Sequence, residues 1–372
     1  MALDASLKAW LTLSLTRGLG GESARRLLKE FGSPEAVFAA SVSSLKSFVK
    51  LDVAAEINKG IADDDIAPAL VWLEDSNNHI VTLADNDYPQ ALLNIPDPPL
   101  LLYVKGRLDL LNRSALAIVG SRSATPQGIN NAEAFAKSLS DAGLCIISGL
   151  AHGIDAAAHR GALRSQSING GSSIAVVGTG LDKIYPAANR DLAHALAQQG
   201  ALVSEFPLGT PPLAANFPRR NRLISGMSMG CLVVEASLQS GSLITARLAL
   251  EQGRDVFAIP GSIHAPQSKG CHALLKQGAK LVEAAQDILE ELGGALVLPI
   301  PMKNAEGADS TDPYSNGQHA ALLEHLGFDP VDGDTLSARS GLTVSELSAM
   351  LLTLELDGRI CVLPGGLYQR IH

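Results

Sequence analysis

The sequence is poor in cysteine and in aromatic residues, and it contains no long apolar run. Its four cysteines, Cys145, Cys231, Cys271 and Cys361, are far apart and form no Cys-x-x-Cys pair. This arrangement argues against a disulfide framework and a structural zinc site, and it fits a reducing cytoplasm. No apolar run approaches the length of a membrane span, and the amino terminus lacks the apolar core of a signal peptide. We therefore expect a soluble, cytoplasmic protein with no membrane partner.

Two common nucleotide-binding motifs are also missing. No Gly-Lys pair exists, so the chain has no Walker A loop, and autonomous ATP hydrolysis is not expected. The nearest approach to Gly-x-Gly-x-x-Gly, at Gly178-Thr179-Gly180, has Lys183 in place of the third glycine. The sequence therefore speaks against a dinucleotide enzyme, and we expect no cofactor.

The charge that is present is unevenly distributed. The formal net charge is −9, yet residues 113–280 hold 15 lysines and arginines against 9 aspartates and glutamates. Three of these arginines, Arg219, Arg220 and Arg222, lie within four positions of the stretch NFPRRNRLISG. A basic middle between acidic flanks is typical of a protein that binds an anion at one site. The alternative is a chance distribution over solvated helix faces.

Short apolar runs alternate with helical segments from residue 115 onward. The runs are ALAIVG, LCIIS, IAVVG, ALVSEF, CLVVEAS and DVFAIPG. Such runs are typical of parallel strands that are buried on both faces and joined by crossover helices, which predicts an open α/β sheet. In the first crossover helix we expect Thr125 as the N-cap, Pro126 at the first helical position and Gly143 just beyond the end.

The chain of 372 residues is 46% hydrophobic, which is enough for two or three domains. Four parts can be distinguished: a helical module at 1–62, an α/β domain at 63–294 with its motifs in 115–280, a linker at 295–318 and a final module at 319–372. Within the second part, a strand-like run at Leu100–Val104 adds an edge element to the sheet. The final module reads helix, turn, helix and two short strands, which suggests a winged helix.

Glycine-rich loops follow four of the predicted strands. They contain Gly120-Ser121-Arg122, SGLAHGIDAAAH, GTGLDKIYP and SLQSGSLITA. In an open α/β sheet the ligand binds at the carboxyl ends of the strands, where helix N-termini favour an anion. Each single loop has the alternative explanation that glycine merely permits a tight turn. Together with the nearby cations, the four loops predict a phosphate-binding rim. The candidate phosphate ligands are Gly120, Ser121, Arg122, Gly149, His152, Gly153, Gly178, Gly180, Lys183, Arg219, Arg220, Asn221, Arg222, Ser240, Gly241, Ser242 and Lys269.

Two histidines and two aromatic residues near these loops are further candidates for binding a metal ion or a nucleobase. His152 and His159 lie about two helical turns apart with Asp155 between them, a spacing that matches no zinc motif, so we expect no metal site. Tyr185 and Phe217 adjoin the basic loops. They could stack on nucleobases, although packing in the core is the default expectation for such residues.

Seven ordered motifs resemble the DNA-processing protein A family, also called Smf. They are AIVGSR, SGLAHGIDAAAH, GTGLDKIYP, SEFPLGTPP, FPRRNRLISG, VVEASLQSGSLITARLALEQGRDVFAIPG and KGCHALLKQGA. The resemblance implies an extended Rossmann-like domain with a mostly parallel open sheet. It also implies single-stranded DNA binding without sequence preference, a homodimer, and loading of a RecA-type recombinase during natural transformation and DNA recombination.

The two ends of the chain resemble the family less closely. GLGGESARRLL is similar to the glycine hairpin of a SAM or helix-hairpin-helix module, which either contacts DNA or only packs. The final module resembles the family's winged helix, yet residues 319–372 hold three arginines against seven acidic residues. Because such a module would repel phosphates, we expect it to contact protein or nothing.

The sequence leaves three functions to weigh against each other. The leading hypothesis is a DNA-binding mediator that is not an enzyme and that holds phosphates without reading bases. The alternative is a nucleotide-processing enzyme similar to the lysine-decarboxylase-like phosphoribohydrolases, but Arg247 and Leu248 stand where that motif carries acidic residues. A pure protein scaffold would leave the basic rim unexplained.

Overall fold

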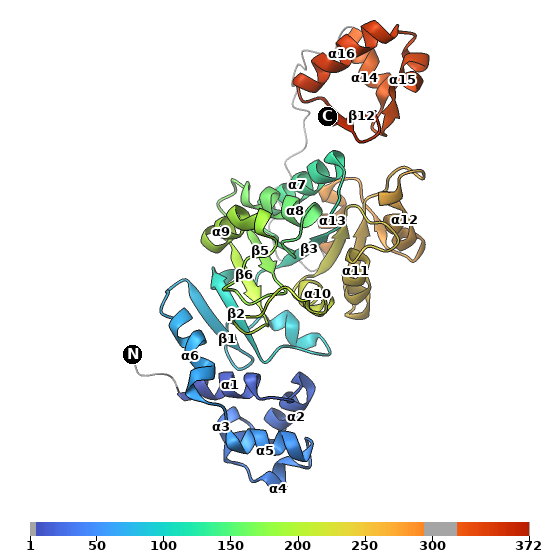
Figure 1. The fold of residues 1–372 in the computed structure, drawn as a ribbon. Helices are drawn as coiled ribbons and strands as arrows, with labels where there is room; N and C mark the ends of the chain where they lie inside the picture. Colours follow the sequence, from blue (N-terminus) through green and yellow to red (C-terminus); the bar gives the residue numbers. More distant parts are fainter. Residues whose placement is uncertain (1–4, 294–317, 372) are drawn as a thin grey trace.

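The computed structural model describes residues 5–293 and 318–371 (Figure 1). Along the chain it shows a helical N-terminal module, a large sheet with helices on both faces, and a small C-terminal module. The predicted linker at 295–318 lies outside the described residues, except for Gln318, which begins a helix. The predicted domain boundaries therefore stay predictions.

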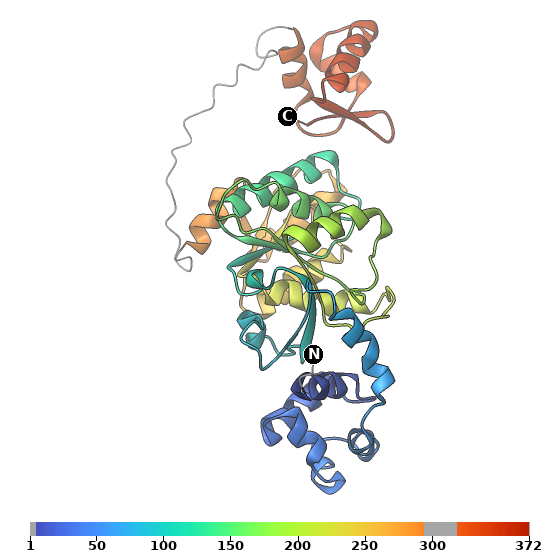
Figure 2. The same ribbon diagram turned by 90° about the vertical axis from the view of Figure 1, so that its left-hand side faces the viewer.

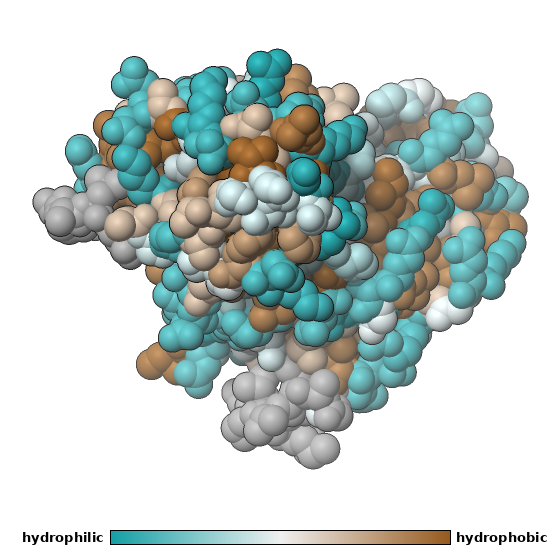
Figure 3. Space-filling model, turned by 90° about the horizontal axis from the view of Figure 1, so that it is seen from below, coloured by the Kyte–Doolittle hydropathy of each residue, from teal (hydrophilic) through white to brown (hydrophobic). Residues whose placement is uncertain are grey.

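Six short helices form the N-terminal part. They are α1 (Ala5–Leu15), α2 (Gly21–Phe31), α3 (Pro34–Ala39), α4 (Val42–Leu45), α5 (Leu51–Lys59) and α6 (Asp63–Trp72). Buried leucines such as Leu13, Leu27 and Leu45 form its core. The face seen from below carries mainly hydrophilic side chains with hydrophobic ones scattered among them (Figure 3). Helix α6 was not predicted; its first turn holds three aspartates, which the helix dipole stabilises there.

The central sheet has nine strands in the order β1-β2-β6-β5-β4-β3-β7-β8-β9. Strands β3 to β9 pair in parallel, whereas β1 and β2 join antiparallel beside β6. The strands are β1 (Asn78–Thr82), β2 (Leu101–Gly106), β3 (Ala115–Val119), β4 (Cys145–Ser148), β5 (Ser173–Val176), β6 (Ala201–Ser204), β7 (Gly230–Val233), β8 (Asp255–Ala258) and β9 (Lys280–Leu281). The six predicted core strands are confirmed. The predicted edge position of the run at Leu100–Val104 is wrong, because β1 covers it on the outer side.

Helices cover both faces of the sheet (Figures 1 and 2). Helices α7, α8 and α13 pack on one face, and α10, α11 and α12 pack on the other. Their bounds are α7 (Pro126–Asp141), α8 (Ile154–Leu163), α9 (Arg190–Gln199), α10 (Asn216–Gly226), α11 (Ser242–Glu251), α12 (Lys269–Lys276) and α13 (Ala285–Leu292), with 3-10 turns η1 (Gln90–Asn94), η2 (Leu108–Leu110), η3 (Ala187–Asn189) and η4 (Pro266–Ser268). The predicted start of α7 is confirmed: Thr125 Oγ1 accepts a hydrogen bond from Gly128 N at 3.0 Å, and Pro126 occupies the first position.

The sheet has a topological switch point between β3 and β7. From β3 the chain proceeds through β4, β5 and β6 in one direction, and from β7 it proceeds through β8 and β9 in the other. The crossover helices therefore diverge at the carboxyl ends of β3 and β7, which leaves a crevice there.

The C-terminal module has the predicted winged-helix order. Its elements are α14 (Gln318–Leu326), β10 (Val331–Asp332), α15 (Gly333–Ser340), α16 (Val344–Leu356), β11 (Ile360–Leu363) and β12 (Leu367–Arg370). The module lies next to α7 in Figure 1, and Gln369 Nε2 donates a hydrogen bond to Gln127 Oε1 at 3.0 Å. Within residues 5–293 and 318–371, no helix has the length and apolar character that crossing a membrane requires.

Candidate nucleic-acid interface

A groove of about 720 Å³ opens at the switch point between β3 and β7. The loop after β3, the loop after β7 and one side of α10 line it. Together with the loop after β5, which carries Tyr185, these elements bring together the predicted residues Gly120, Ser121, Arg122, Tyr185, Phe217, Arg220, Asn221, Ser240, Gly241 and Ser242. The carboxyl edge of the sheet thus holds a groove where the strand pattern predicted a ligand.

An exposed cation and two aromatic rings form a cluster on the groove wall. The guanidinium carbon of Arg122 lies over the ring of Phe217, 5.8 Å from its centroid. The ring of Tyr185 lies 5.7 Å from that of Phe217, at an interplanar angle of 38°. Tyr185 is 47% exposed, so this pair is not packed in the core, contrary to the default expectation. A guanidinium beside partly exposed aromatic rings suits a ligand that carries both phosphate and bases.

The N-terminus of α11 lies at the same groove. Its N-cap is Gly241, which has no side chain to cap the first turn. Ser240 and Ser242 lie beside it, with their hydroxyl oxygens 2.7 Å apart. The amides of Ser242, Leu243 and Ile244 are bonded to Ser240 and Gly241. The helix dipole and the serine hydroxyls are therefore the groups at this end that favour an anion.

Arg220 lies beneath the groove, with only 4% of its surface exposed. Its Nη1 donates hydrogen bonds to Gly149 O at 2.6 Å and to Val176 O. Burial lowers the pKa of this guanidinium to about 10, while the nearby Asp155 carboxylate opposes that shift. Only Nη1 is occupied by internal carbonyls, whereas the buried Nε of Arg220 has no hydrogen-bond partner among the described residues. The predicted phosphate contact of Arg220 therefore stays a prediction.

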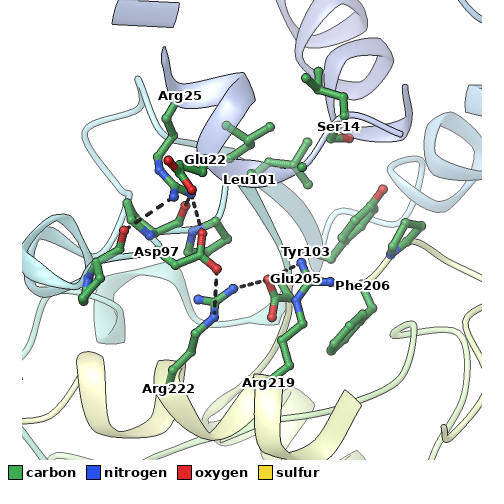
Figure 4. A pocket seen from close by; sticks show the side chains of 18 residues that line it. Ser14, Glu22, Arg25, Asp97, Leu101, Tyr103, Glu205, Phe206, Arg219 and Arg222 are labelled. Carbon is green, nitrogen blue, oxygen red and sulfur yellow. Dashed lines mark hydrogen bonds and ion pairs between the residues drawn. The ribbon is translucent and has the colours of Figure 1, made fainter. Parts of the chain in front are cut away.

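Arg219 and Arg222 point to the opposite side of α10, into a second hollow of about 720 Å³ against the N-terminal module (Figure 4). Arg222 Nη2 donates to Glu205 Oε2, and Arg222 Nε lies 3.5 Å from Asp97 Oδ2. Arg219 Nη2 lies 3.2 Å from the same Glu205 oxygen. Burial raises the pKa of Glu205, and the two arginines oppose this rise. Helical rotation thus places both arginines outside the groove, and their predicted phosphate contacts stay predictions.

Two predicted lysines lie outside the groove. Lys183 Nζ donates to Gly209 O at 2.7 Å, and Lys269 Nζ donates to Ile263 O. Lys183 thus joins the loop after β5 to the loop after β6, and Lys269 joins the start of α12 to the loop before it. The predicted glycines Gly149, Gly153, Gly178 and Gly180 form the turns next to the groove without lining it, and His152 is exposed beside them.

His159 has a structural role and does not join His152. Its ring is fully buried, and Nδ1 lies 2.8 Å from the hydroxyl oxygen of Ser173. Burial lowers the pKa of His159 to about 3, so the imidazole is neutral. The side chain therefore packs between α8 and β5 and cannot act with the exposed His152 on a shared ligand.

Several residues that line the groove were not predicted from the sequence. Ser123, Thr245 and Gln267 line the groove, and Gln267 Nε2 donates to Ser123 O at 3.2 Å. Gln267 comes from the loop after β8. Because ligands bind beyond the carboxyl ends of the strands, this position could have identified Gln267 as a candidate. Asp155 also lines the groove. From the sequence it was noted only as lying between His152 and His159, and no role was predicted for it.

A mostly parallel sheet with a cationic and aromatic groove at its switch point is typical of Rossmann-like proteins that bind a nucleotide or a nucleic acid. Comparison with known families narrows this class. Residues 79–293 match the family model described as DNA recombination-mediator protein A, and residues 306–366 match the DprA winged helix domain. The chain belongs to the DNA recombination-mediator protein A family, also called DprA or Smf.

Individual relatives agree with this assignment. Protein Smf of Escherichia coli (strain K12) is 47% identical over 313 residues, which cover 82% of this chain and 81% of that protein. DNA processing protein DprA of Streptococcus pneumoniae is 49% identical over 210 residues, covering 56% of this chain and 73% of that protein.

Two solved structures are also similar. The X-ray structure of DNA processing protein A from Streptococcus pneumoniae has a TM-score of 0.66 and 38% identity, covering 76% of this chain and 97% of that one. The structure from Helicobacter pylori, described for its single-stranded DNA binding mode, has a TM-score of 0.53 and 31% identity, covering 58% and 97%. Both similarities support the same Rossmann-like fold and the same family.

Proposed function

We propose that this protein binds single-stranded DNA in the groove at the switch point, without reading the bases, and acts as a recombination mediator and not as an enzyme. The Helicobacter pylori relative is described by its single-stranded DNA binding mode, which supports the choice of ligand. Membership of a recombination-mediator family supports the role.

The cluster of Arg122, Phe217 and Tyr185 is the observation that carries the proposal. Arg122 can pair with a phosphate while the two rings accept the faces of neighbouring bases. The dipole and the serine hydroxyls at the N-terminus of α11 can hold a second phosphate. Because stacking and phosphate contacts use parts common to all nucleotides, such a site tolerates any sequence.

The groove favours binding over hydrolysis. The carboxylate of Asp155 accepts hydrogen bonds from the backbone amides of Gly149 and Ala151 at 3.1 and 3.4 Å, so it is engaged as a structural acceptor. Arg247 is exposed on α11, where the phosphoribohydrolase motif would carry a carboxylate. Incubation with nucleoside monophosphates should release no free base.

The wider role follows from the family resemblance. We propose that the protein acts as a cytoplasmic homodimer that loads a RecA-type recombinase on single strands during natural transformation. For the winged-helix module we propose contact with protein and not with a DNA groove. Its helix α16 exposes Val344, Leu352 and Leu356 at 70%, 58% and 79%, in an acidic module. Apolar side chains at these positions suit a protein surface and offer nothing to phosphates.

Titration with labelled oligo-dT at several salt concentrations tests the proposed DNA binding. The logarithm of the affinity should fall linearly with the logarithm of the salt concentration. Arg122→Ala should weaken binding to all sequences about equally and reduce that slope by about 0.7, the value for one phosphate contact on a single strand.

Arg164→Ala is the matched control, because this exposed arginine pairs with Glu133 away from the groove. It should leave both affinity and slope unchanged. An affinity that does not respond to salt, or an Arg122→Ala variant that binds like the parent, would contradict the proposal.

A further inference from the structure

The turn after β4, residues 149–151, is held by charged side chains from two other elements. Asp155 Oδ2 on α8 accepts hydrogen bonds from the amides of Gly149 and Ala151. Arg220 on α10 donates to the carbonyl of Gly149 at 2.6 Å. Both backbone groups of Gly149 are therefore engaged by the buried charged side chains of Asp155 and Arg220.

Only glycine fits between these two ions. A Cβ atom at position 149 would lie 2.6 Å from Asp155 Oδ2 and 2.7 Å from the guanidinium carbon of Arg220. These separations are shorter than van der Waals contact, so any side chain would push the ions apart. The turn and these two side chains are thus fitted to each other.

The next residue of the turn has an unfavourable backbone. Leu150 has φ 59°, in the left-handed region that residues with a side chain rarely adopt. Asn189 Nδ2 donates to the carbonyls of Leu150 at 2.9 Å and of Ala151 at 3.2 Å. Such a conformation persists only when the surroundings fix it, and here Asp155, Arg220 and Asn189 together supply that constraint.

This turn supports the loop that carries Arg122. It leads directly into Gly153, where an added Cβ would lie 2.8 Å from the carbonyl oxygen of Arg122. Ile154 N donates to Ser121 O at 3.1 Å. The backbone of the loop after β3 therefore rests on the segment that the clamped turn positions.

Arg220 also fixes the other side of the groove. It lies on α10, one helical turn after Phe217, and its second carbonyl partner is Val176 at the end of β5. Its bonds therefore tie the helix that carries Phe217 to the turn under the Arg122 loop. The separation of Arg122 from Phe217 depends on this tie.

We infer that Arg220 is a positioning residue for DNA binding: it joins α10 to the turn after β4, sets Arg122 opposite Phe217, and makes no contact with the DNA. The inference rests on the proposed function of the groove. Asp155 and Asn189 assist by fixing the same turn. Arg220 thus affects DNA affinity only by holding Arg122 and Phe217 in their relative positions.

The test compares Arg220→Gln/Asp155→Asn with Arg122→Ala in oligo-dT titrations at several salt concentrations. The double substitution removes both ions together, which avoids leaving one buried charge unpaired. We expect affinity to fall about tenfold while the salt slope stays at the parental value, because a preorganised site is lost but no phosphate contact is. For Arg122→Ala we expect the slope itself to fall.

Two results would overturn the inference. A folded double variant with parental affinity would show that Arg220 only stabilises the domain, and a slope reduced as in Arg122→Ala would show that it contacts phosphate. If Arg122→Ala binds like the parent, the proposed function fails instead. Circular dichroism at the titration temperature establishes that each variant is folded.

Asn189→Ala provides a second route if the double variant does not fold. It removes only the bonds to Leu150 and Ala151. Asn77→Ala is the matched control, since Asn77 Nδ2 donates one comparable bond to Ala197 O at 2.9 Å, remote from the groove. We expect Asn189→Ala to weaken oligo-dT binding several-fold with an unchanged salt slope, and Asn77→Ala to have no effect on binding. Equal affinities of these two variants would overturn the inference.

Discussion

Arg222 and Glu205 form an ion pair on the side of α10 that faces the N-terminal module (Figure 4). Their side chains are 12% and 3% exposed. Asp97 lies next to Arg222 and is itself bound by Arg25 of α2, whose Nη1 lies 2.6 Å from Asp97 Oδ1. The ions thus form a chain from the helical module through α10 to the end of β6.

Neutralising Glu205 should destabilise this junction. In Glu205→Gln the buried guanidinium of Arg222 loses its main counter-ion, so the free energy of unfolding should fall by about 3 kcal/mol. Urea denaturation measures this change. Glu133→Gln is the control, because its partners Arg160 and Arg164 are largely exposed, and its cost should be below about 1 kcal/mol. Equal costs would mean that the pair at Glu205 is effectively solvated.

Removing the ring of Phe217 should weaken DNA binding without altering its salt dependence. Loss of one stacking platform costs about 1–3 kcal/mol per base, and no phosphate contact is lost. Phe328→Ala is the matched control, because Phe328 is a 51% exposed ring with Arg370 over it at 4.9 Å, in the winged-helix module. Fluorescence anisotropy with oligo-dT compares the two variants. A parental affinity in Phe217→Ala would exclude stacking at this ring.

Arg219→Ala should affect DNA binding far less than Arg122→Ala. Arg219 is 58% exposed, but it is paired with Glu205 and lies over Phe206 at 5.4 Å, outside the groove. We expect an affinity within about threefold of the parent and an unchanged salt slope, since no phosphate contact is lost. A slope reduced by about 0.7 would show that the bound strand extends across α10.

His159 should make the stability depend on pH. In the folded protein burial lowers its pKa from 6.5 to about 3, so below pH 6.5 the unfolded chain binds a proton that the folded protein does not. Its contribution is fully present above pH 6.5, and it decreases by up to about 1.4 kcal/mol per pH unit on acidification. Thermal unfolding of His159→Gln should show a smaller loss of stability between pH 6.5 and pH 4 than the parent. His194→Gln, at an exposed position of α9, should behave like the parent.

Much of the fold was predictable because its signals are local. Continuous apolar runs identify the buried parallel strands, and Thr125 with Pro126 identifies the start of α7. The edge ribbon β1 was missed because its sequence, NHIVT, is short and half polar. Helix α6 was missed because three aspartates suggested a connection, whereas in the structure they form a first helical turn.

The candidate site was predictable only at the level of loops. Arg219, Arg220 and Arg222 are neighbours in sequence, but on a helix they point in different directions. Which arginine faces a ligand depends on partners distant in sequence: Glu205 and Asp97 for Arg222, and the carbonyl of Gly149 for Arg220. Without these contacts, charge density could predict a cationic region but not its available donors.

The helical module and the sheet share one apolar interior. Trp10 and Leu11 of α1 and Ile66 of α6 belong to the same buried cluster as Leu101 and Tyr103 of β2. A recombinant fragment that begins at residue 79 would therefore expose an apolar strip of the sheet to solvent. Such a fragment should precipitate or self-associate when expressed alone. Truncations intended to isolate the α/β portion need to retain these early helices, or to replace the uncovered residues with polar ones.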